Sequence, residues 1–243
     1  MLRIGAFELE HVGHACFLFR AGGGVVATDP FFADHFEWKG HVERYLTRPA
    51  IRPEDISSCS AVFVSHIHGD HFDPEAIEAI VGTTAAEVWA PPDVADVLRG
   101  RGSCGRVVAL DGGAELRAGR ITARACAGYD HSYDDLGRPN KFSLLLEADG
   151  TRLFYSGDCH EPPPDAVGDA VDAVVAWPHP DDTKLRRLVG AFRTKRLVLM
   201  HGDRFEPGDF FCNFDYDEQK RRVERLMPGM EALIPRRLAR AGG

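Results

Sequence analysis

Hydrophobic residues fall in short blocks along the whole chain, and glycine, proline, aspartate and asparagine separate these blocks. Apolar or alternating blocks of about four to eight residues between turn residues are typical of β-strands. The block at 61–65 is almost continuously apolar, which indicates a strand buried on both faces. The pattern predicts strands at 7–11, 15–19, 24–27, 61–65, 87–90, 106–110, 114–116, 121–126, 142–147, 152–156, 173–177 and 197–200.

Helical patterns occupy fewer segments. Asp73 and Pro74 suit the N-cap and the first position of a helix, which is predicted to run to about Val81. Asp149-Gly150 predicts a hairpin turn between two of the strands. Further helices are predicted at 92–99, 184–192 and 217–226.

Composition bounds the class of protein. A length of 243 residues with 44% hydrophobic residues supports a core of ordinary size, and the absence of a clear linker predicts one α+β domain over 1–243. The formal charge is 29 − 37 = −8, which repels nucleic-acid phosphates. We therefore expect a small-molecule substrate and no nucleic-acid partner, and the sequence leaves homo-oligomer formation open.

The cysteines and the apolar runs indicate a cytoplasmic protein. The six cysteines form no CxxC pair and are widely spaced, so buried, reduced thiols are expected. The first residues lack an apolar signal core. No run approaches the roughly 18 apolar residues of a membrane span.

The strongest chemical signal directly follows the apolar block at 61–65. Four potential metal ligands fall within six positions: His66, His68, Asp70 and His71. Imidazole and carboxylate groups suit zinc, with manganese or iron as alternatives. The residues follow a strand, so we expect a loop that Gly69 bends sharply, with the four side chains turned toward metal ions. Such a cluster is improbable as a chance surface loop.

A catalytic metal centre needs further ligands from elsewhere in the chain. His131, Asp158 and His201 stand at predicted strand ends, but spacing alone does not select them from the other histidines and aspartates. His201-Gly202-Asp203 also repeats the tripeptide His68-Gly69-Asp70, which is a weak echo between the two halves of the chain.

The HxHxDH motif resembles the signature of the metallo-β-lactamase superfamily. Two further motifs, Gly13 to Phe17 and Thr28-Asp29-Pro30, resemble the start of the branch that includes L-ascorbate-6-phosphate lactonase. The resemblance covers nearly the whole chain. It implies a four-layer αββα sandwich with metals at one edge between two sheets.

The resemblance also implies two divalent metal ions and the residues that bind them. His66, His68 and His131 would hold the first ion, and Asp70, His71 and His201 would hold the second. Asp158 would bridge them. A bridging hydroxide would then cleave a small ester, lactone or phosphoester, with Asp70 orienting it and accepting its proton.

Several neighbours of these ligands depart from the branch or have open roles. Cys159 stands where threonine is common, and 177–182 replaces a glycine-rich stretch, which weakens the transfer of lactonase activity. His14 is a candidate to act on substrate or a structural histidine. Asp29 is expected to orient a ligand histidine. His160 and His179 could contact substrate or a surplus metal, or be incidental.

Two aromatic stretches, at 31–38 and 205–214, follow the Asp29-Pro30 turn and His201. They would begin beside the metals, so they either form a partly apolar rim of the pocket or serve core packing or dimer contact.

The leading hypothesis is metal-dependent hydrolysis. The first alternative is a di-iron redox protein with a separate electron donor. The second is a phosphodiesterase of the N-acyl phospholipid type. A nuclease is disfavoured by the charge, and a non-catalytic metal protein is disfavoured by the complete set of ligands.

Overall fold

The computed structural model describes residues 1–128, 137–207 and 213–238. Its first large sheet begins with antiparallel strands and continues with parallel ones from the fourth strand onward. Its strands, in spatial order, are β1 (Leu2–Ile4), β2 (Phe7–Gly13), β3 (Cys16–Ala21), β4 (Gly24–Thr28), β7 (Ala61–Phe63), β8 (Glu87–Ala90) and β9 (Val107–Ala109).

The second large sheet repeats this plan, with antiparallel strands first and parallel strands after β13. Its strands are β10 (Glu115–Ala118), β11 (Ile121–Ala127), β12 (Phe142–Ala148), β13 (Thr151–Tyr155), β14 (Ala173–Ala176), β15 (Arg196–Leu199) and β17 (Glu231–Leu233). The predicted turn at Asp149-Gly150 joins β12 to β13, and both of its residues have positive φ angles.

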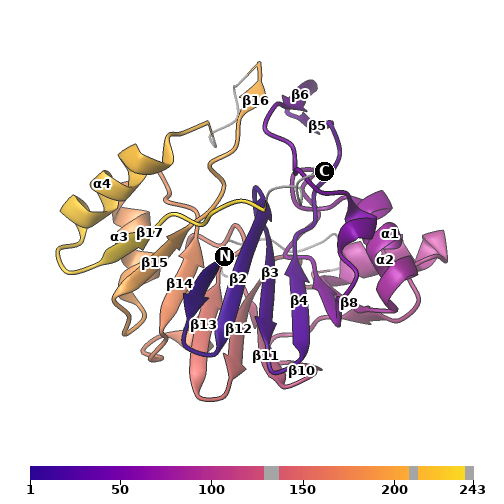
Figure 1. The fold of residues 1–243 in the computed structure, drawn as a ribbon, viewed down its shortest axis with the longest axis horizontal. Coiled ribbons are helices and arrows are strands. Elements are labelled where there is room, and N and C mark those ends of the chain that lie inside the picture. Colours follow the sequence, from indigo (N-terminus) through magenta and orange to yellow (C-terminus); the bar gives the residue numbers. More distant parts are fainter. Residues whose placement is uncertain (129–136, 208–212, 239–243) are drawn as a thin grey trace.

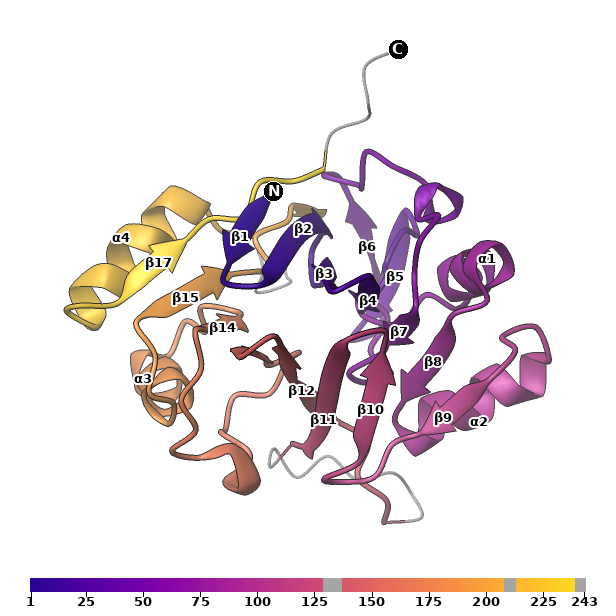
Figure 2. The same cartoon turned by 60° about the horizontal axis from the view of Figure 1, so that its bottom comes forward.

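Helices cover the outer faces of both sheets (Figure 1). Two helices, α1 (Pro74–Thr84) and α2 (Pro92–Arg101), pack on the first sheet. The other two, α3 (Asp182–Gly190) and α4 (Tyr216–Leu226), pack on the second. Figure 2 shows the two pairs on opposite sides of the paired sheets. The expected αββα arrangement is confirmed.

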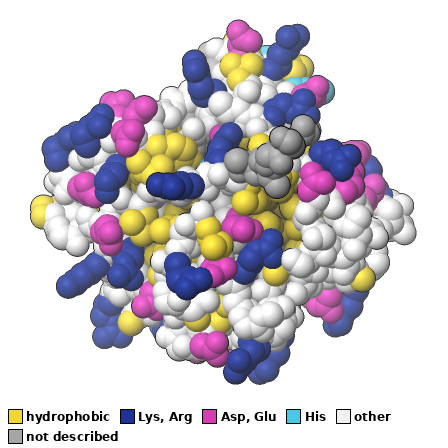
Figure 3. All heavy atoms as spheres, in the orientation of Figure 1, with side chains coloured by type: hydrophobic (Ala, Val, Ile, Leu, Met, Phe, Trp, Pro, Cys, Tyr) yellow, Lys and Arg dark blue, Asp and Glu magenta, His cyan; other side chains and the backbone are white. Residues whose placement is uncertain are grey.

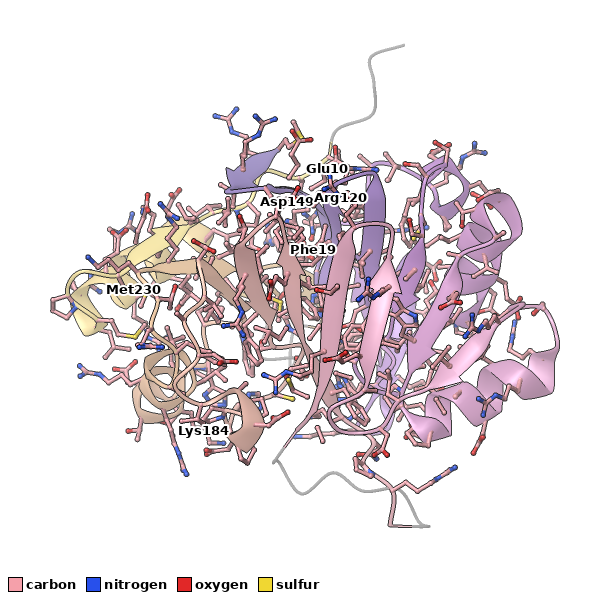
Figure 4. The ribbon with its side chains drawn as sticks, turned by 90° about the horizontal axis from the view of Figure 1, so that it is seen from below. Glu10, Phe19, Arg120, Asp149, Lys184 and Met230 are labelled. Atoms are coloured by element: carbon pink, nitrogen blue, oxygen red, sulfur yellow. The ribbon has the colours of Figure 1, made fainter. Side chains whose placement is uncertain are left out.

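The main core lies between the two sheets. Along β12, Phe142, Leu144 and Leu146 face this core, while Leu145 faces the helices. This alternation follows from the two-residue period of a strand. Phe19, labelled in Figure 4, belongs to the same inter-sheet core and is fully buried.

Most predicted elements exist, with ends that differ by a few residues. Helix α1 extends to Thr84 and ends where Ala85 adopts a left-handed conformation. As predicted, Asp73 caps this helix, and its side chain accepts a hydrogen bond from the Ala76 N–H. Helix α3 begins at Asp182 rather than at 184, because Asp181 caps it through two backbone N–H groups.

A small third sheet was not predicted. It contains β5 (His35–Trp38), β6 (His41–Tyr45) and β16 (Phe205–Glu206). These strands are short, and β16 joins the hairpin of β5 and β6 from about 160 residues away, so no local pattern reveals the pairing. Short strands β1 and β17 and two 3₁₀ turns, Pro53–Asp55 and Pro164–Ala166, were also missed.

Five of the cysteines are buried free thiols, as expected: Cys16, Cys59, Cys104, Cys126 and Cys159. Cys212 lies outside the described residues. Within the described chain, no helix combines the length and the apolar character of a membrane span.

Replacing Leu144 with alanine should lower the free energy of unfolding by about 2–5 kcal/mol, because the side chain is fully buried between the sheets and leaves a cavity. Urea unfolding followed by circular dichroism measures the change. The control Val97→Ala, at a position 43% exposed on α2, should stay within about 0.5 kcal/mol of the parent. Equal losses in both variants would contradict the assigned core.

Candidate metal centre

The predicted site residues come from strand ends that meet at one edge of the two sheets. Strands β4 and β7 are parallel, and Asp29 and His66 follow their carboxyl ends. Strands β13, β14 and β15 are also parallel, and Asp158 and His201 follow the first and the last of them. Parallel strands bring their carboxyl ends to the same edge, so the fold gathers these side chains.

The gathered side chains form two clusters. The first cluster contains His66, His68 and Asp158, and the second contains His14, Asp70, His71 and His201. Within each cluster, the potential ligand atoms all lie within 4.8 Å of one another. Six of the seven expected ligands therefore come together, and the seventh, His131, lies outside the described residues.

Asp158 connects the two clusters. Its Oδ2 atom lies 3.6 Å from Nε2 of His66, and its Oδ1 atom lies 3.2 Å from Nε2 of both His71 and His201. Each oxygen of Asp158 thus faces imidazole nitrogens of a different cluster.

Asp29 holds the loop that carries the motif. One oxygen accepts a hydrogen bond from the Ser65 N–H at 2.6 Å, and the other from the Ser65 hydroxyl at 2.7 Å. The second oxygen also lies 2.8 Å from Nδ1 of His71 and accepts from the Tyr155 hydroxyl at 2.7 Å. A proton on Nδ1 leaves Nε2 of His71 available as a ligand. Asp29 thus contacts a histidine of the motif and holds its loop, and the role of His71 as a metal ligand stays a prediction.

Two glycines combine a tight turn with a close approach. A Cβ atom on Gly157 would lie 2.6 Å from Cβ of Ser65, so only glycine brings the loop before Asp158 against the motif loop. Gly157 also has a positive φ of 53°. As expected, Gly69 lies in a turn, which the hydrogen bond from the His71 N–H to the His68 carbonyl closes at 3.0 Å. Gly69 does not need a left-handed conformation there, and its Cβ position would lie 3.0 Å from Cβ of Phe36.

His14 lies behind the second cluster and is completely buried. Its Nε2 atom lies 3.0 Å from Oδ2 of Asp70, and its ring centre lies 4.0 Å from that of His201. Its backbone N–H donates to Asp203, which also accepts from the hydroxyls of Tyr45 at 2.9 Å and Thr47 at 3.0 Å. His14 thus belongs to the second cluster of potential ligands, whereas the sequence left contact with substrate and a structural role open.

The segment that contains most of these residues matches a known protein family. The sequence model of the β-lactamase superfamily domain matches residues 8–176, which include the motif, Asp158 and the strands that present them. This chain belongs to the β-lactamase superfamily.

Relatives and solved structures agree with that membership. An uncharacterized protein of Mycobacterium tuberculosis is 30% identical over 150 residues, which are 60% of this chain and 40% of that protein. A protein of Pyrococcus abyssi named as a metal-dependent hydrolase is 23% identical over 154 residues, 63% of this chain and 62% of that protein. The match thus spans less than two thirds of either relative.

Three solved structures share the fold at low identity. An isothiocyanate hydrolase from gut bacteria of Delia radicum has a TM-score of 0.66 at 17% identity and covers 94% of this chain and 95% of its own. A metallo hydrolase from Ignicoccus hospitalis has 0.61 at 17%, covering 96% and 95%. The diiron β-hydroxylase CmlA from Streptomyces venezuelae has 0.62 at 19%, covering 96% and 53%.

Carboxylates and imidazoles of the two clusters shift each other's pKa values. Burial would lower the pKa of His71, but the nearby carboxylates of Asp158, Asp70 and Asp29 outweigh burial and raise this pKa well above its ordinary value. Burial opposes ionisation of Asp158, yet His71 and His201 hold its pKa well below the usual range. Three carboxylates around one imidazole favour positive charge at this point.

The imidazoles of the first cluster are in the form that binds metals. Burial, together with the neighbouring His71, lowers the pKa of His66 well below its ordinary value. Burial also lowers the pKa of His68. Lys141 is 9% exposed, and its charge acts in the same direction on both histidines. Neutral imidazoles bind divalent cations, whereas protonated ones do not.

The donor set fits metal ions. Nε2 of His66 and Oδ1 of Asp70 are buried and have no hydrogen-bond partner within the described part of the chain. Buried polar atoms without partners are costly, so such a group of inward-facing ligand atoms indicates a site for cations. Imidazole nitrogens with carboxylate oxygens suit zinc, manganese or iron.

Solvent reaches the centre on the side of the first cluster. His68 is exposed and the Asp158 side chain is 17% exposed, whereas His14, His71 and His201 are fully buried. A substrate must therefore approach from the His68 side or along the surface next to Asp158.

The described parts of the two aromatic stretches pack inside the protein. Phe31, Phe36, Tyr45 and Phe205 form one buried cluster, and the Phe205 ring centre lies 5.2 Å from that of His14. The structure thus favours core packing over a pocket rim for these residues. Phe32 is buried too and Phe214 is half-buried, whereas Phe210 and Phe211 lie outside the described residues.

Sequence reasoning missed the supports that tertiary structure supplies: Tyr45, Thr47, Ser65, Lys141, Tyr155, Asp203 and Arg237. Only Asp203 had a signal, as the last residue of the repeated His-Gly-Asp tripeptide. Its carboxylate fixes the backbone of His14 and pairs with Arg237 from the C-terminal part of the chain.

Replacing Asp29 with asparagine should weaken zinc binding by about tenfold to a hundredfold, because the amide no longer fixes the His71 tautomer with a charged acceptor. Competition with a chromophoric chelator measures the affinity. Asp34→Asn, at an exposed aspartate in the following stretch, is the matched control and should bind zinc like the parent. Parent-like affinity in the Asp29→Asn protein would refute the orienting role.

Proposed function

We propose that this chain is a metal-dependent hydrolase that cleaves a small ester, lactone or phosphoester at a centre for two divalent cations. The position of Asp158, with one oxygen toward each ligand cluster, carries the proposal. The Pyrococcus abyssi relative and two of the structural neighbours are named as hydrolases, which supports the reaction class.

The two clusters define the proposed ligand sets. His66 and His68 would hold the first cation together with His131, which remains a prediction. Asp70, His71 and His201 would hold the second. Asp158 would be shared. The position of Nε2 of His14 in the second cluster makes His14 either a further ligand or the partner that holds Asp70 in place.

Bound divalent cations would supply a water of lowered pKa and would polarise the scissile carbonyl or phosphoryl oxygen. The chain's own residues orient the reactants. Asp70 has one oxygen 3.0 Å from His14 and the other without a hydrogen-bond partner among the described residues. The second oxygen is therefore available to orient the attacking water and to take its proton. The buried histidines exclude bulk water from the inner side.

The charge of the protein favours a small substrate over a nucleic acid. The net charge is −8, and on the face in Figure 3 basic and acidic side chains are interspersed rather than gathered. A polyanion binds to an extended basic surface, which the composition does not favour. A lactone, the substrate class of the branch that the N-terminal motifs resemble, is included in the proposal as a cyclic ester.

Replacing His66 with alanine should lower kcat/KM by more than about a hundredfold, because it removes a ligand from the first cluster. Zinc-loaded protein is assayed on a panel of lactones, aryl esters and phosphodiesters. His35→Ala, at an exposed histidine of β5, is the matched control and should retain parental activity. Undiminished turnover by the His66→Ala protein would exclude the proposed centre as the site of reaction.

Metal content tests the reaction class independently. Purified protein should contain zinc or manganese, and dialysis against a chelator should lower its melting temperature, because bound metal stabilises the folded state by mass action. Readdition of the metal should restore the melting temperature. Iron that changes colour on reduction, in a protein inactive on every ester of the panel, would instead support the di-iron redox alternative suggested by the fold shared with CmlA.

A further inference from the structure

Three aromatic rings stand beside the metal centre without belonging to either ligand cluster. Trp177 follows β14, and His160 and His179 lie near it. Their ring centres are 5.4 Å apart for His160 and Trp177, 4.8 Å for Trp177 and His179, and 4.5 Å for the two histidines. We call these three residues the Trp177 ring group. All three are half-buried, so part of each side chain is exposed.

The Trp177 ring group lies directly against the proposed centre. The indole of Trp177 stacks on His201 with ring centres 6.0 Å apart and an angle of 27° between the planes. His160 is two residues after the bridging Asp158. A substrate whose scissile bond reaches the two ligand clusters would therefore have its adjoining part next to these rings.

Backbone contacts hold the segment of the ring group in one conformation. Arg222 of α4 donates to the carbonyls of Pro178, His179 and Pro180 at 3.2, 2.7 and 3.0 Å, and it also pairs with Asp182. A segment fixed in advance loses little conformational entropy when a ligand binds. This rigidity suits a recognition surface.

The orientation of His179 is fixed as well. Its Nδ1 atom accepts a hydrogen bond from the Asp181 N–H at 2.9 Å, so the proton of the neutral ring lies on Nε2. Burial, and next the charge of His160, lowers the pKa of His179 to about 4. The ring is therefore uncharged at neutral pH.

Two arginines next to the ring group are already engaged. Arg222 binds three carbonyls and Asp182, and Arg187 pairs with Glu161 at 2.8 Å. The ring group itself offers flat ring faces and ring edges. Such surfaces prefer a flat π-system, which stacks on an indole or meets ring edges at right angles.

We propose that the Trp177 ring group is a binding face for a flat, unsaturated or aromatic part of the substrate. This inference rests on the proposed function and specifies its substrate class: esters or lactones that carry a planar group next to the scissile bond. Trp177 supplies the stacking surface, and His160 and His179 border it.

The direct test compares two ligands with the same metal-binding head. Phenylphosphonate and cyclohexylphosphonate differ only in a flat or a puckered ring, and calorimetry on zinc-loaded protein gives both dissociation constants. The parent should bind phenylphosphonate about threefold to tenfold more tightly. A surface that binds through the hydrophobic effect alone would bind the larger, more apolar cyclohexyl ring at least as well. Equal binding or a cyclohexyl preference in the parent would overturn the proposal.

Substitutions in the Trp177 ring group test whether it causes the preference for phenylphosphonate. Trp177→Leu should abolish the phenyl preference at unchanged zinc content, and Trp177→Phe should retain most of it. Lys184→Met is the control and should keep the phenyl preference. This exposed lysine of α3 (Figure 4) affects His179 through its charge. An unchanged preference in Trp177→Leu would refute the assignment. Should that variant not fold, His179→Leu decides in the same way, with a reduced preference expected.

A hydrolysis assay distinguishes failure of the proposed binding face from failure of the proposed hydrolase function. The parent should turn over benzyl acetate faster than cyclohexylmethyl acetate, and Trp177→Leu should lose the difference mainly through KM. If neither ester, nor any other on the panel, is cleaved while phenylphosphonate still binds preferentially through Trp177, the hydrolase proposal fails and the binding face stands. If both esters are cleaved equally by the parent, the binding face fails and the hydrolase proposal stands.

Discussion

The structure depends on the burial of carboxylates among imidazoles at the edge of two sheets. Asp158 has His66 on one side and His71 and His201 on the other, and desolvation of such charges is costly unless an opposite charge compensates them. In the cation-free chain, the raised pKa of His71 supplies part of that compensation. A divalent cation in each cluster would do so more completely, which explains why ligand atoms without partners persist there.

The remainder of the fold keeps these groups from relaxing apart. Asp29, His14 and His201 all have positive φ angles, which are costly for residues with a side chain. Each is held by contacts from a different part of the chain. Asp29 is bound by Ser65 and Tyr155, and His14 by Asp203. Rigid supports of this kind preserve ligand geometry during a reaction, at the expense of local stability.

The two sides of the centre have different tasks. The second cluster is fully buried and backed by the aromatic cluster around Phe205, which suits its residues for holding and orienting groups from the inner side. The first cluster and the neighbouring Trp177 ring group are partly exposed, so substrate contact falls to them.

The sequence by itself determined most strands and helices and four candidate ligands. Apolar blocks of strand length and the capped helix at Asp73 follow from local periodicity, and HxHxDH places four potential ligands on one loop regardless of the rest. Only tertiary structure decided the partners, because they act across long separations. Asp203 reaches His14 over 189 residues, and β16 pairs with β6 to enclose Phe205. No local pattern encodes such contacts, since they exist only once two sheets pack and their strand ends meet.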